Sequence, residues 1–92
     1  MQTCEALISM SNPQRCLLRL CKHWGHKFAV KVDGPRGHID FGDSSCELKV
    51  VGTQLQVCLQ VAEQEDPTAL QEVVAEHLQR MVIEPLQVDW RC

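Results

Sequence analysis

Two histidines and a cysteine lie close together in the segment LCKHWGHKF, residues 20–28. His23 and His26 are three residues apart, a spacing that makes two side chains neighbours on a helix. Imidazole is a common ligand of iron, copper and zinc, so the pair could hold a transition metal. The alternative is a structural role, because a histidine in the last turn of a helix interacts favourably with the carbonyl end of that helix. The spacing alone favours the structural role.

A further histidine, His77, falls on the apolar stripe of a second predicted helix. A buried imidazole needs partners for its nitrogens, which are either hydrogen-bonding groups or a bound ion, and ordinary hydrogen bonds are the commoner solution. Cys46 begins the inward-facing set of its predicted strand, and both helices should cover that face. The candidate metal ligands are therefore His23, His26, Cys46 and His77, and the candidate ligand-binding residues are Trp24 and Phe41.

No catalytic residue is predicted. Cysteine and histidine pairs can be drawn in many combinations in this chain, so none of them indicates a nucleophile. Asp43, Ser44 and Ser45 are of the types that form turns. An enzyme is therefore the third choice, behind a binding domain and an interaction module.

The chain changes its hydrophobic period several times. Residues 4–10 are predicted to form a first strand. Ser11-Asn12-Pro13 predicts a helix start, and the apolar stripe that follows predicts a helix up to Trp24, closed by Gly25 in the left-handed conformation. Alternation with period two in residues 28–32, 39–41, 46–50 and 55–61 predicts four antiparallel strands. Asp66-Pro67 begins a second helix that Pro85 must stop, and residues 85–92 form an extended tail.

These elements give the order β-α-β-β-β-β-α in one domain, residues 1–92. A sheet with one apolar face must cover that face, and the two amphipathic helices are the available cover. The prediction is an α+β two-layer sandwich, an antiparallel sheet with both helices on one face and the tail packed on the body. The residues predicted to be largely buried are Leu17, Leu20, Trp24, Phe28, Val30, Ile39, Phe41, Leu48, Leu55, Val57, Leu59, Leu70, Val74 and Leu78.

Composition excludes some classes of function. The net charge is −3 and the basic residues are scattered, which argues against a nucleic-acid partner. The first fifteen residues have the pattern of neither a signal peptide nor a membrane span, so a cytoplasmic protein without a membrane partner is expected. The six cysteines show no paired spacing, and in a reducing compartment all six are expected to be free thiols.

The segments LCKHWGHKF, GHIDFGDSSCEL, LQVCLQVAE, VVAEHLQRM and LQVDW together resemble a small bacterial family, domain of unknown function 2218. The positions that match its pattern are Leu20, Cys21, His23, Trp24, His26, Lys27, Gly37, Ile39, Phe41, Cys46, His77, Leu78 and Trp90. The resemblance covers nearly the whole chain and implies a fold without an established activity. Some relatives occur beside or fused to siderophore-interacting reductases, which implies a link with iron handling and a partner of that type.

The order of elements is also similar to the TATA-box-binding-protein-like fold, which includes the C-terminal domain of phosphohexomutases. Those enzymes carry an arginine and a Ser-Gly-Thr phosphate loop after the glycine-led strand. Here the loop reads FGDSSCEL, with acidic Asp43 and no arginine, which argues against a phosphosugar ligand. A shared fold does not imply a shared function.

Two classes of function follow. The first is a ligand- or metal-binding accessory domain connected with iron or siderophore handling, with iron, copper or zinc as the metal. The second is a non-enzymatic protein-interaction or homodimerisation module. The sequence is compatible with a monomer or a homodimer.

Overall fold

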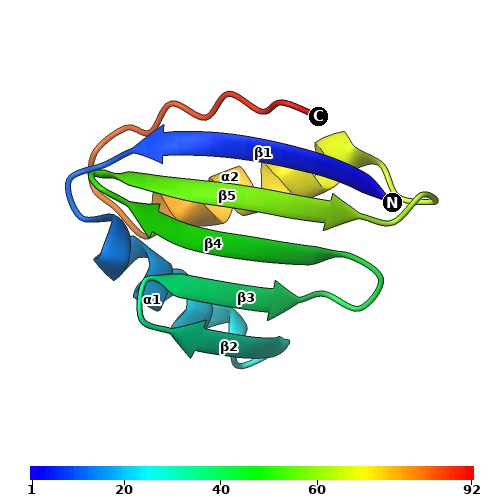
Figure 1. The fold of residues 1–92 in the computed structure, drawn as a ribbon, viewed down its shortest axis with the longest axis horizontal. Helices are drawn as coiled ribbons and strands as arrows, with labels where there is room; N and C mark the ends of the chain where they lie inside the picture. The colour runs from blue at the N-terminus through cyan, green and yellow to red at the C-terminus, as the bar shows by residue number, and fades with distance from the viewer.

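A five-stranded antiparallel sheet in the order β1-β5-β4-β3-β2 organises residues 1–92 in the computed structural model (Figure 1). The strands are β1 (Gln2–Ser9), β2 (Ala29–Asp33), β3 (Arg36–Asp40), β4 (Ser45–Val51) and β5 (Gln54–Val61). The helices α1 (Pro13–Trp24) and α2 (Pro67–Arg80) lie on the same face of the sheet (Figure 1). The predicted α+β fold and its order of elements are confirmed.

Both helices begin as their sequences predict. The side chain of Asn12 accepts a hydrogen bond from the backbone N–H of Arg15 at 3.1 Å, and that of Asp66 accepts one from Thr68 at 3.0 Å. Each of these residues is followed by a proline, whose missing N–H costs nothing in a first turn. Neither helix is long and apolar enough to cross a membrane.

The end of α1 differs from its prediction in one respect. Gly25 has φ −62° and ψ −18°, so it is right-handed, and the expected left-handed closure is wrong. The chain instead continues as a tight turn, in which the N–H of Phe28 donates to the carbonyl of Trp24 at 2.8 Å. A Cβ on Gly25 would lie 3.0 Å from the carbonyl oxygen of Cys21, so the glycine provides room rather than an unusual dihedral angle.

The core lies between the sheet and the two helices. Of the residues predicted to be buried, ten are buried: Leu17, Leu20, Trp24, Ile39, Leu48, Leu55, Val57, Leu59, Val74 and Leu78. The other four, Phe28, Val30, Phe41 and Leu70, are only partly buried. Phe28 and Val30 belong to the border of the sheet around β2, which has a neighbouring strand on one side only. The period of the sequence gives the face of a strand but not its place in the sheet, which explains this difference.

The C-terminal tail follows the free side of β1 (Figure 1). Glu5 and Arg91 exchange two backbone hydrogen bonds, of 2.7 and 2.8 Å. This pairing places Cys4 opposite Cys92, and the two cysteines form a disulfide bond. The expectation of six free thiols is therefore wrong for this pair, while Cys16, Cys21, Cys46 and Cys58 are free.

Candidate functional site

His23 and His77 lie side by side where the two helices meet. His23 occupies the last turn of α1 and His77 the last turn of α2. The centres of their imidazole rings are 5.4 Å apart, with the ring planes inclined by 44°. His23 is exposed and His77 is partly buried, so the pair is accessible from solvent. The structure thus brings together two of the four candidate metal ligands.

The orientation of His77 is held by its own helix. Its Nδ1 donates a hydrogen bond to the carbonyl oxygen of Val73 at 2.7 Å. A carbonyl only accepts, so the neutral imidazole carries its proton on Nδ1 and presents a lone pair on Nε2. Ligating histidines in metal sites are commonly oriented in this way, by a hydrogen bond from the other ring nitrogen to a backbone carbonyl.

The aromatic candidates Trp24 and Phe41 pack beside the histidine pair. The Trp24 ring lies 4.9 Å from that of His77 and 5.0 Å from that of Phe41, centre to centre. Phe28 extends the chain of rings, with its centre 4.9 Å from that of Phe41. The contacts of Phe41 with Trp24 and Phe28 are edge-to-face, a favourable arrangement of aromatic rings. Trp24 is buried, whereas Phe28 and Phe41 are partly buried, so the row of rings runs from His77 along the edge of the core.

The other two metal candidates occupy different surroundings. His26 is exposed in the turn between α1 and β2. Cys46 is fully buried in β4, and its neighbours in the sheet are Ile39 and Leu59. Burial raises the pKa of the Cys46 thiol, with smaller contributions from nearby ionisable groups, so the sulfur is protonated at neutral pH.

No three or more histidine, cysteine, aspartate or glutamate side chains are grouped so that they could hold a metal ion by themselves. Of the four candidate metal ligands, only His23 and His77 lie side by side.

A hollow of about 170 Å³ lies elsewhere, between the first turns of α1 and the segment that follows α2. It is lined by Ser11, Asn12, Arg15, Cys16, Arg19, Met81, Val82, Ile83 and Glu84.

Comparison with known proteins shows which protein family this chain belongs to. The family model described as an uncharacterised protein conserved in bacteria (DUF2218) matches residues 5–91. The chain belongs to this family. The NMR structure of PA4090 from Pseudomonas aeruginosa is similar to it, with 42% sequence identity and a TM-score of 0.82. The likeness covers 99% of this chain and 96% of that one. No curated protein matches.

Two residues of the family pattern touch each other in this DUF2218 domain. Gly37 of β3 lies under α1, and a Cβ at this position would be 2.8 Å from the sulfur of Cys21 and 3.4 Å from Leu17. Glycine is therefore needed for the close approach of α1 to the sheet. This contact sets the height of α1 above the sheet and thereby helps to place His23 near α2.

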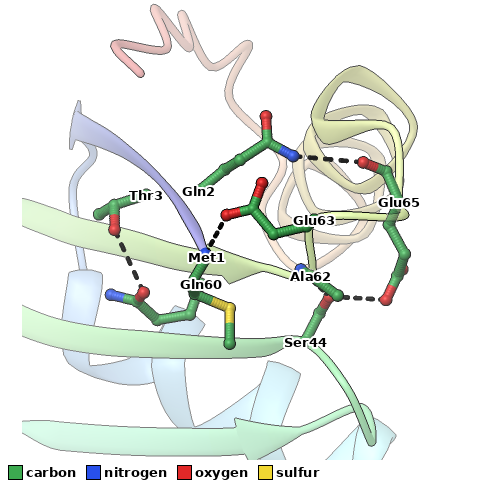
Figure 2. A network of polar contacts seen from close by, with 8 residues as sticks. All are labelled: Met1, Gln2, Thr3, Ser44, Gln60, Ala62, Glu63 and Glu65. Carbon is green, nitrogen blue, oxygen red and sulfur yellow. Dashed lines mark hydrogen bonds and ion pairs between the residues drawn. The ribbon is translucent and has the colours of Figure 1, made fainter.

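Ser44 is a buried polar residue that the sequence indicated only as a turn former. Its hydroxyl donates to a carboxylate oxygen of Glu65 at 2.8 Å and accepts from the N–H of Ala62 at 3.0 Å. Figure 2 shows this link between the β3–β4 loop and the segment before α2, together with the ion pair between the N-terminus and Glu63. The link fixes the entry into α2, the helix that carries His77.

The open face of the sheet carries a row of ionisable side chains across four strands. Glu5, Cys58, Glu47 and His38 are successive neighbours in the register of β1, β5, β4 and β3. His38 pairs with Glu47, and the Cys58 sulfur lies 3.9 Å from a carboxylate oxygen of Glu5. Desolvation, followed by the charges of Glu5 and Glu47, raises the pKa of the Cys58 thiol. The alternation of the strands places this row on the face opposite to the histidine pair.

Proposed function

We propose that this domain is a small accessory module that binds a transition-metal ion, free or held by a small chelating molecule, through His23 and His77. The observation that carries the proposal is the hydrogen bond from His77 Nδ1 to the Val73 carbonyl, which leaves Nε2 available as a ligand. The ring of His23, whose centre lies 5.4 Å from that of His77, would provide the second nitrogen, and its exposed side chain has room to turn toward the ion. Both imidazoles suit iron, copper and zinc.

Two nitrogens fill only part of the coordination sphere of these metals. Tetrahedral zinc needs four donors, so the remaining positions would be taken by water or by donor atoms of a chelating molecule. Trp24 is buried beside His77, so the apolar contact for such a molecule would come from the neighbouring, partly buried ring of Phe41. The resemblance to relatives that occur beside or fused to siderophore-interacting reductases makes iron the first metal to test, and a reductase of that type is the proposed partner.

Cys46 is not part of the proposed metal site, and His26 is a candidate for a third ligand. A thiol must lose its proton to bind a metal, and burial opposes this for Cys46. His26 follows α1 by two residues and is exposed, so it could join the ion from the turn. A variant that lacks His26 distinguishes a site of two histidines from a site of three.

We propose the cytoplasm as the compartment, because four of the six cysteines, Cys16, Cys21, Cys46 and Cys58, are free thiols. The Cys4–Cys92 bond argues in the other direction, because stable disulfides are uncommon in reducing compartments. Alkylation of thiols in freshly lysed cells distinguishes the cytoplasm from a compartment in which the disulfide bond is stable. Six alkylated cysteines support the cytoplasm, and four contradict it.

Titration calorimetry of the reduced protein with Fe²⁺ and Zn²⁺ under anaerobic conditions tests the metal site. Near-stoichiometric binding is expected for the wild type and for His38→Ala, a control on the opposite face of the sheet. His23→Ala and His77→Ala should each lose this binding, and the double variant should lose little more, because one imidazole alone does not hold the ion. Equal binding by the wild type and His77→Ala, or no binding at all, would reject the proposal.

A further inference from the structure

The two edges of the sheet differ. The outer side of β1 is paired with Arg91 of the tail and tied to it through the Cys4–Cys92 bond. β2 has β3 as its only neighbour, and Figure 1 shows no strand along its other side. An uncovered edge strand presents free backbone donors and acceptors and is a template for pairing with another strand.

The backbone groups that β2 presents can be identified. The N–H of Val50 donates to the carbonyl of Pro35 at 2.8 Å, a bond that flanks the Arg36–Lys49 pair. The backbone groups of Arg36 therefore point away from β4 and toward its β2 partner, Asp33. Because the direction alternates along a strand, the N–H and C=O groups of Val30 and Val32 point outward.

Apolar side chains accompany these groups. Val32 is 46% exposed, and Leu18 of α1 is 47% exposed. Gln14, one helical turn before Leu18, donates from its side chain to the carbonyl of Gly34 at 3.0 Å, next to the end of β2. Residues four apart share a helix side, so Leu18 lies on the side of α1 that faces the β2 edge. His23 lies on the other side, toward α2.

We infer that β2 pairs with β2 of a second copy of this chain, antiparallel and centred on Val32. In this register Val32 faces the same residue of the second copy, and Lys31 of each copy faces Asp33 of the other. Neither Lys31 nor Asp33 has an ion-pair partner within the fold. Opposite charges directly across two strands stabilise their pairing, whereas a register centred on Lys31 would place like charges opposite each other.

The resulting dimer has a two-fold axis and one continuous ten-stranded sheet, from two sheets of five strands each. β2 has only five residues, so the contact is small and the dimer is weak. It is therefore expected to form at high protein concentration and to dissociate on dilution. The metal site lies on the opposite side of α1 and is independent of this contact.

Sedimentation equilibrium over a range of protein concentrations tests the pairing through a charge exchange. Lys31→Asp places two carboxylates opposite each other in each cross-strand pair, and Asp33→Lys places two ammonium groups there, so each variant alone should be monomeric. An equimolar mixture of the two variants restores opposite charges in both pairs and should form a heterodimer. Lys49→Asp, on the open face of a central strand, should self-associate like the wild type.

Circular dichroism of each variant establishes that it is folded before the comparison is made. A wild type that is monomeric at every concentration would overturn the inference. Self-association of Lys31→Asp equal to that of the wild type, or a mixture that stays monomeric, would also overturn it, because the register requires the exchange of charges. If the single variants are monomeric and their mixture forms a dimer, the result supports both pairing through the β2 edge and the register centred on Val32.

Discussion

The imidazole rings of His23 and His77 lie 5.4 Å apart although α1 and α2 are separated in the chain by four strands. His77 also packs on Trp24 and donates to a carbonyl of its own helix. Replacing His77 therefore leaves no hydrogen-bonding group on another element without its partner. His77→Ala should lower the free energy of unfolding of the metal-free protein by about 0.5–1.5 kcal/mol, the size of one aromatic contact. Urea denaturation measures this, and a loss above about 3 kcal/mol, the upper end for stranding a buried hydrogen-bond partner, would indicate a purely structural histidine.

The Cys4–Cys92 bond should stabilise the oxidised protein by closing nearly the whole chain into a loop. Cys92→Ser is expected to lower the free energy of unfolding by about 2–4 kcal/mol under oxidising conditions. In the presence of a reductant the wild type and the variant should be equally stable. A difference that persists after reduction would mean that Cys92 contributes through packing and not through the bond.

Ser44 should contribute strongly to stability although it belongs to a loop. Ser44→Ala removes the partner of the Ala62 N–H and of the Glu65 carboxylate and should cost about 1–3 kcal/mol. Ser45→Ala, the neighbouring control, should change stability by less than about 0.5 kcal/mol. Thermal unfolding of both variants checks the difference. Equal effects would show that the buried link in Figure 2 is not important for stability.

Cys58 should react slowly with alkylating reagents. The thiolate is the reactive form, and both burial and the neighbouring carboxylates raise the pKa of this thiol, so less thiolate is present at a given pH. Glu5→Gln removes one of these charges and should lower the pKa of Cys58 and speed its alkylation under mildly alkaline conditions. Rates for Cys58 can be read by mass spectrometry of the native protein. A slower reaction in Glu5→Gln would contradict the electrostatic cause.

Local patterns in the sequence were sufficient to predict most of the fold. The alternation in residues 55–61 and the Asn12-Pro13 and Asp66-Pro67 starts are local signals, and each became the predicted element. The Cys4–Cys92 bond depends on how the tail pairs with β1, and a single bridge between Glu5 and Arg91 leaves no periodic signal in the sequence. The incomplete burial of Phe28 and Val30 depends on the order of the strands, which a single sequence does not encode locally.

In the candidate site, too, some features follow from local sequence patterns and others depend on the tertiary arrangement. The apolar stripe of the second helix placed His77 toward the core, and a cluster of His23, His77 and Cys46 was geometrically possible. The structure brings the two histidines together, leaves His77 only partly buried, and keeps Cys46 apart inside the sheet. The hydrogen bond between His77 and Val73 could not be predicted, because it depends on a side-chain rotation that helical spacing does not fix. The Ser44–Glu65 link joins two loops, whose relative position is set by the whole sheet.

The tautomer and metal response of His77 test the central claim most directly. Long-range ¹H–¹⁵N NMR spectra at about pH 8, above the usual pKa of histidine near 6.5, resolve the two ring nitrogens of each imidazole. The metal-free protein should show His77 with its proton on Nδ1. One equivalent of Zn²⁺ should shift the resonances of His77 Nε2 and of one ring nitrogen of His23, and leave those of His38 in place. A proton on Nε2 of His77, or resonances of His23 and His77 that do not move, would contradict the proposed site.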